Sequence, residues 1–168
     1  MDNRFQILKK LDNIRQQTLQ RLENLTQRQL DWKPPGWSGL TTAETNLSLG
    51  ELFMHLAIDE IYLREMIARP LLEGVKPPDQ ITFPPPPSPY GLPKEAIRFW
   101  FERAREMTRR MIEELPPEIN LKLTHMGGFE QMNGLEWLEA FGGHEEFHLA
   151  QIDELAALVT KIKKPPKS

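Results

Sequence analysis

The amino-acid sequence predicts an all-α fold, a four-helix bundle in which a long proline-rich crossover joins the second helix to the third. Three observations lead to this expectation. Four segments carry apolar residues at helical spacing, no segment shows the alternation of a half-buried strand, and one connection holds two clusters of prolines. The length of that connection argues against simple up-down-up-down threading.

The first two helices are bounded by clear start and stop signals. The first is predicted over about residues 3 to 28, and the paired prolines Pro34-Pro35 follow it because proline cannot continue a helix. The second begins at Ser48, which forms the pattern of a capping box with Glu51 three residues later. Arg69-Pro70 is expected to close or bend this helix.

The crossover runs from about residue 70 to residue 92 and is expected to form a stiff, extended strap. The third helix resumes at Pro93, a residue favoured in the first turn, and Pro116-Pro117 ends it. The last helix is predicted from near Asn133 to about Lys161. The chain is therefore expected to form one domain over residues 1–162, followed by a basic flexible tail over residues 163–168.

Composition narrows the class of protein. The 168 residues are 39% hydrophobic and 27% charged with a net charge of −3, which is typical of a globular protein and gives no basic surface for nucleic acid. The N-terminus does not resemble a signal peptide, and no apolar run approaches membrane-spanning length. We therefore expect a cytoplasmic protein with no nucleic-acid or membrane partner. The absence of cysteine excludes thiolate ligands and a catalytic thiol supplied by the chain.

The histidines carry the strongest functional signal. His144 and His148 are four residues apart in the last helix, so they project from one face. His55 lies on the inner face of the second helix, and the three imidazoles can converge on one divalent metal with open coordination positions. The alternative is three hydrogen-bonded core histidines, but burying them without partners would cost about 1–3 kcal/mol each.

Other polar residues near this site have more than one interpretation. Asp59 lies one turn after His55, and it could orient an imidazole, accept a proton from bound water as a catalytic residue, or pair with an arginine. Glu145 and Glu146 are expected to point away from the inner face into solvent. His125 is expected in a loop, at the surface or at the rim of the pocket.

Three segments resemble sequence motifs of a known family. Residues 46–57, which contain Ser48, Glu51 and His55, resemble the "W-S-x-x-E-x-x-x-H-L" segment of the DinB/YfiT-like proteins. Residues 144–152 resemble their closing "H-x-x-x-H-x-x-Q-I" motif, and residues 124–137 resemble the linker that precedes it. Asn46-Leu47 in place of the usual tryptophan, and Met126-Gly127 in place of a proline, depart from the family pattern.

This resemblance implies a four-helix bundle with a long crossover and a site for nickel, zinc or iron whose ligands are His55, His144 and His148. Some relatives are thiol-dependent transferases or isomerases, others are predicted hydrolases, and the family is often dimeric. The resemblance therefore implies a small-molecule substrate, a possible homodimer and a possible external low-molecular-weight thiol. Arg64, Arg98 and Arg105 are candidates for binding such a thiol.

The sequence leaves three functions open. The leading hypothesis is a metal-dependent transferase or hydrolase, in which the ion activates a bound thiol or water. The second is a non-catalytic bundle that binds a metal or a small molecule, related to stress. The third is a structural bundle in which the histidines only form hydrogen bonds.

Overall fold

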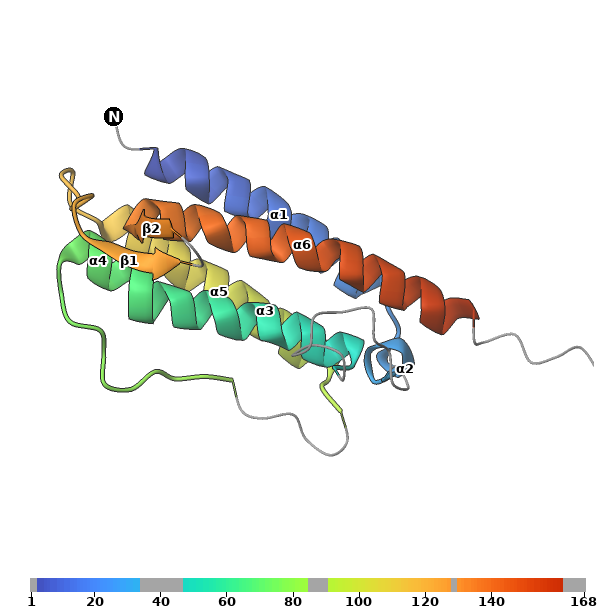
Figure 1. Cartoon of the computed structure of the whole chain (residues 1–168). Coiled ribbons are helices and arrows are strands. Elements are labelled where there is room, and N and C mark those ends of the chain that lie inside the picture. Colours follow the sequence, from blue (N-terminus) through green and yellow to red (C-terminus); the bar gives the residue numbers. More distant parts are fainter. Residues whose placement is uncertain (1–2, 34–46, 85–90, 128–129, 162–168) are drawn as a thin grey trace, which may run out of the picture.

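Helices make up most of the computed structural model, which describes residues 3–33, 47–84, 91–127 and 130–161 (Figure 1). The four long helices are α1 (Arg4–Asn24), α3 (Leu49–Leu63), α5 (Lys94–Glu114) and α6 (Gly134–Lys161). Helix α1 packs against α5 and α6, and α3 packs against the same two helices. This agrees with the expected all-α class, apart from one small hairpin described below.

The first predicted helix is two helices in the structure. Helix α1 ends at Asn24, and the short helix α2 (Gln27–Leu30) follows it after an extended residue, Leu25. The break lies at Thr26, whose hydroxyl accepts a hydrogen bond from the backbone N–H of Gln29, while the side chain of Gln29 accepts one from the N–H of Thr26. This capping box starts a new helix within residues 3 to 28, which the apolar periodicity assigned to a single helix.

The second predicted helix begins where expected but does not end at Arg69-Pro70. Ser48 and Glu51 form the predicted capping box, with the N–H of Ser48 donating to Glu51 Oε2 over 2.6 Å. Helix α3 then continues through a π-helical turn, η1 (Arg64–Ala68), into α4 (Arg69–Glu73). Pro70 lies just after this π-helical turn, which interrupts the regular α-helical hydrogen-bond pattern. Gly74, with a φ of 70°, ends the helix in the left-handed conformation.

The hairpin is a structure that the sequence analysis missed. Strands β1 (Thr124–Gly127) and β2 (Glu130–Asn133) pair antiparallel, with Thr124 opposite Asn133. Asn133 connects it directly to α6. The side-chain oxygen of Asn133 accepts hydrogen bonds from the N–H groups of Leu135 and Glu136. In return, the backbone N–H of Asn133 donates to the Glu136 carboxylate over 2.7 Å.

The crossover and the chain end are described only in part. Residues 75–84 form no helix or strand, whereas residues 85–90 and the predicted tail at 163–168 lie outside the described residues. No helix in the described part of the chain is long and apolar enough to cross a membrane.

Two apolar clusters form the core, and a polar layer separates them. One cluster contains Leu22 of α1, Phe53 of α3, Ile97 of α5 and Ile152 of α6 among its members. The other contains Leu11, Leu72, Ile112 and Leu138. Along all four long helices the residues between these clusters include buried charged or hydroxyl side chains, among them Arg15, Glu60, Arg105 and Glu145.

The junction between the hairpin and α6 gives a test of the packing. A Cβ on Gly134 would lie 2.4 Å from Leu72 Cγ and 2.8 Å from the carbonyl oxygen of Ala68. We expect Gly134→Ala to lower the free energy of unfolding by about 1–3 kcal/mol, because α4 and η1 must move away. A Cβ on Gly143, in the same helix, would meet no atom of the described residues within 4 Å.

Gly143→Ala is therefore the matched control, and we expect it to raise the free energy of unfolding by about 0.5–1 kcal/mol. Urea denaturation followed by circular dichroism measures both variants. If Gly134→Ala and Gly143→Ala changed the free energy of unfolding equally, α6 would not pack closely on α4.

Candidate metal centre

Helices α3 and α6 bring the three predicted histidines together. His55 lies on α3, and His144 and His148 lie one turn apart on α6, which packs against α3. One nitrogen from each imidazole lies within 4.8 Å of the corresponding nitrogen of the other two. Ring centroids are 4.5 to 5.5 Å apart. This is an arrangement in which three nitrogens can reach one ion.

The two histidines of α6 face each other. Nε2 of His144 lies 2.7 Å from Nε2 of His148, so both nitrogens point to the same place. His148 is fully buried, and its Nδ1 lies 2.5 Å from Oε1 of Gln151, which is also buried. Because an amide oxygen only accepts, Nδ1 of His148 carries the proton and Nε2 keeps its lone pair. Gln151 thus fixes the tautomer that a metal ligand needs.

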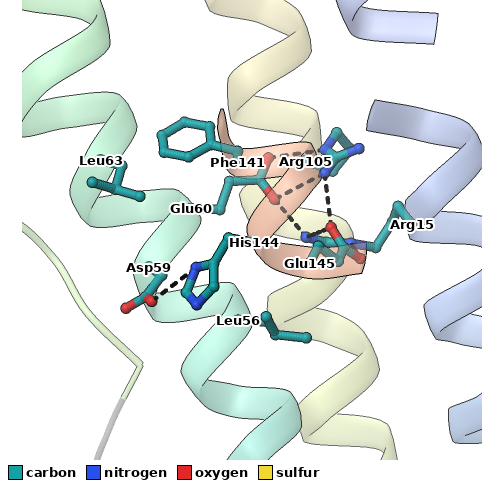
Figure 2. Close-up of a pocket in the computed structure, with 9 residues that line it drawn as sticks. All are labelled: Arg15, Leu56, Asp59, Glu60, Leu63, Arg105, Phe141, His144 and Glu145. Carbon is teal, nitrogen blue, oxygen red and sulfur yellow. Dashed lines mark hydrogen bonds and ion pairs between the residues drawn. The ribbon is translucent and has the colours of Figure 1, made fainter. Parts of the chain in front are cut away.

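Asp59 lies beside two of the three histidines. Its Oδ2 is 3.3 Å from Nε2 of His55. The same oxygen is 3.4 Å from Nδ1 of His144 (Figure 2). The side chain is 29% exposed, so it can contact both an imidazole and a molecule that enters from solvent. Of the roles that the sequence left open for Asp59, the geometry favours contact with the imidazoles.

The remaining candidates lie elsewhere. His125 is exposed on β1, with its ring centroid 6.0 Å from that of Trp137, and it belongs to no group of metal-ligating residues in the described part of the chain. Arg98 forms an ion pair with Glu23 at the surface. Arg64 is buried and donates to the carbonyl oxygen of Ala104 over 2.8 Å.

Glu145 corrects the sequence analysis, because it is buried and not solvated. Figure 2 shows it next to His144 but turned toward α1, where it meets Arg15. Arg15 Nε donates to Glu145 Oε1 over 2.9 Å, and Arg15 Nη2 donates to Glu60 Oε2 over 2.6 Å. The charge of Glu145 is satisfied inside the protein, which helical spacing alone could not predict.

Arg105 completes this buried group, and it is therefore not available to bind a thiol. Its Nε donates to Glu60 Oε1 over 2.9 Å, and its Nη2 donates to Glu145 Oε2 over 3.3 Å. The hydroxyls of Thr18 and Thr108 each donate to one of the two carboxylates, over 2.5 and 2.7 Å. We call Arg15, Glu60, Arg105 and Glu145 the charge cluster; one member comes from each long helix.

The charge cluster keeps Glu60 ionised although it is buried. Burial alone would raise the pKa of Glu60, but the guanidiniums of Arg105 and Arg15 lower it, and hydrogen bonds from Arg105 and Thr108 lower it further, to about 2. The same carboxylates raise the pKa of Arg105 against the opposing effect of burial. Two positive and two negative charges therefore remain paired inside the protein at neutral pH.

The charge cluster adjoins the histidines. A cavity of about 10 Å³, close to the space that one water molecule needs, lies between them (Figure 2). Asp59 and His144 line it on one side, and Arg15, Glu60 and Arg105 line it on the other. Glu60 directly follows Asp59 in α3, and Glu145 directly follows His144 in α6, so the charge cluster holds the two turns that carry the site.

Comparison with known protein families shows a match over most of the chain. The model of the family described as the DinB superfamily matches residues 10–152, which include all three histidines and Asp59. No curated protein and no solved structure matches the chain.

Removing one member of the charge cluster tests its contribution to stability. We expect Arg15→Met to lower the free energy of unfolding by about 3–5 kcal/mol, because two buried carboxylates then share one guanidinium. Arg21→Met is the matched control, since Arg21 pairs with Asp153 between the same helices but at the surface. Arg21→Met should lower the free energy of unfolding by less than about 1 kcal/mol. Equal losses of unfolding free energy in the two variants, measured by urea denaturation, would show that the buried pairs contribute no more than a surface pair.

The pKa of Glu60 predicts how stability depends on pH. Its carboxylate stabilises the fold fully above its ordinary pKa of 4.5, and this contribution is lost as the pH falls toward about 2. The free energy of unfolding of the wild type, relative to that of Glu60→Gln, should therefore fall by about 3 kcal/mol as the pH is lowered across this range. Denaturation of both proteins between neutral and acidic pH measures it. A difference that stays constant with pH would show that folding does not lower the pKa of Glu60.

Proposed function

The chain belongs to the DinB superfamily, and we propose that it is a divalent-metal-dependent enzyme whose metal is held by His55, His144 and His148. The convergence of one nitrogen from each within 4.8 Å of the others supports this proposal. Three neutral imidazoles suit nickel, zinc or iron, and a set of three protein ligands keeps coordination positions open for a reactant.

The neighbouring side chains are suited to support such a site. Gln151 holds the proton of His148 on Nδ1, and Asp59 can do the same for His144, whose Nδ1 is 3.4 Å from Oδ2. Each contact directs an Nε2 lone pair toward the common point. Polar partners of this kind usually both orient imidazole ligands and increase their basicity.

The proposed reaction is a thiol-dependent transfer or isomerisation, or a hydrolysis, of a small molecule. A bound divalent ion would favour the ionised form of a coordinated thiol or water. Asp59, which is partly exposed, is the residue placed to accept the released proton at Oδ2. The thiol would have to come from outside, because the chain contains no cysteine.

We further propose that the helices form a single four-helix bundle domain over residues 1–162, with the crossover joining its second and third helices. The proposal includes a cytoplasmic location and a possible homodimer. The net charge of −3 supports a small-molecule substrate over nucleic acid.

Metal content tests the ligand assignment. We expect tag-free wild-type protein to hold about one nickel, zinc or iron ion per chain by mass spectrometry, and His148→Ala to lose it, because His148 supplies a fully buried ligand. His125→Ala is the matched control, since His125 is exposed on β1 and should leave the metal content unchanged. Wild type that holds no metal after incubation with all three ions would overturn the proposal.

Two turnover assays distinguish a hydrolase from a thiol-dependent transferase. The metal-loaded protein is incubated with an activated aryl ester, and separately with an electrophile and a low-molecular-weight thiol. Asp59→Asn should lower the rate per bound metal ion at least tenfold, because the proton acceptor is lost. The metal content of the variant is measured alongside, because Asp59 also contacts His144. Metal binding without turnover in either assay would favour a non-catalytic metal-binding bundle.

A further inference from the structure

A second and much larger cavity lies outside the histidine site. It has a volume of about 470 Å³ and lies between α3, η1, α5 and residues 78–82 of the crossover, which runs alongside α3 (Figure 1). No histidine lines it, and neither does Asp59. Its volume falls within the range of small-molecule sites, about 300–1,000 Å³.

One wall of this cavity is aromatic and apolar. Phe99 and Trp100 on α5 contact each other edge to face, with ring centroids 5.4 Å apart, and Met107 lies on the same helix. Phe99 is 57% exposed, although it is a large apolar side chain. Aromatic rings and a thioether in this position can pack against a planar or apolar body.

The polar side chains of the cavity carry an excess of positive charge. Arg64, Arg69 and Arg103 line it, together with a single carboxylate, Glu65. Glu65 is already paired, with its Oε1 2.8 Å from Arg64 Nε and its Oε2 3.8 Å from Arg69 Nη1. Arg69 also pairs with Glu73, whose Oε1 lies 3.0 Å from Arg69 Nε. Arg103 is exposed and forms no ion pair with the described residues, so its guanidinium is available for an anion.

The backbone adds an independent observation. The π-helical turn η1 begins at Arg64, and π-helical turns inside α-helices are frequently found at functional sites. Arg64 is only 1% exposed and is fixed by bonds to the carbonyl oxygen of Ala104 and to Thr108, so it forms a rigid part of the wall. Its charge is paired with Glu65, which leaves Arg103 as the arginine available to an anion.

We propose that this cavity binds an organic anion with a planar apolar body. The body packs against Phe99 and Trp100, and the anionic group lies near Arg103. This site is distinct from the proposed metal centre, so it would bind a second molecule, such as an effector, in addition to the substrate.

The test uses 8-anilinonaphthalene-1-sulfonate, a planar organic anion whose fluorescence rises in apolar surroundings. We expect saturable binding of one molecule per chain to the folded wild type. Arg103→Gln should raise the Kd about tenfold, because a charge-assisted contact to the sulfonate is lost. Arg110→Gln, an exposed arginine on the same helix that pairs with Glu106, is the control and should change the Kd less than twofold.

Two further measurements identify the site. Phe99→Ser, at an exposed position that the core does not need, should also weaken binding, whereas His148→Ala should leave the Kd unchanged. The uncharged analogue N-phenyl-1-naphthylamine should bind wild type and Arg103→Gln equally well. The proposal is overturned if no saturable binding occurs, if Arg103→Gln and Arg110→Gln behave alike, or if only His148→Ala abolishes binding.

Discussion

The charge cluster is the interaction on which the rest of the structure depends. Two arginines and two glutamates, one from each long helix, meet in a layer that separates the two apolar clusters of the core. Sliding or rotating one helix against the others would separate these pairs, and a buried carboxylate that loses its guanidinium costs several kcal/mol. The charge cluster therefore favours one register of the four helices.

This register is also what brings the histidines together. Glu60 and Glu145 are held by the same two arginines, and each directly follows a residue of the proposed site, Asp59 or His144. Because α3 and α6 are fixed at that level, His55 faces His148 at a ring separation of 5.2 Å. Stability and the proposed metal chemistry thus share one layer of the molecule.

The sequence predicted the features that local patterns determine. It located the long helices, the capping box at Ser48 and the three histidines, because helical spacing and caps depend on neighbouring residues. It missed the hairpin, since two strands of four residues are too short to show alternation. It misplaced Glu145, whose burial depends on Arg15 from a helix 130 residues away. The interruption of the apolar face of α1 at Arg15 and Thr18 was the available signal.

The affinity for zinc of a variant without the full charge cluster tests the central claim most directly. Zinc titration by calorimetry compares wild type, Arg15→Met and Arg21→Met at a temperature at which circular dichroism shows all three folded. If the charge cluster positions the histidines, the Kd of Arg15→Met is at least tenfold higher, equivalent to about 1.4 kcal/mol, and that of Arg21→Met is unchanged. A folded Arg15→Met protein with wild-type affinity would show that the charge cluster contributes stability but does not position the site.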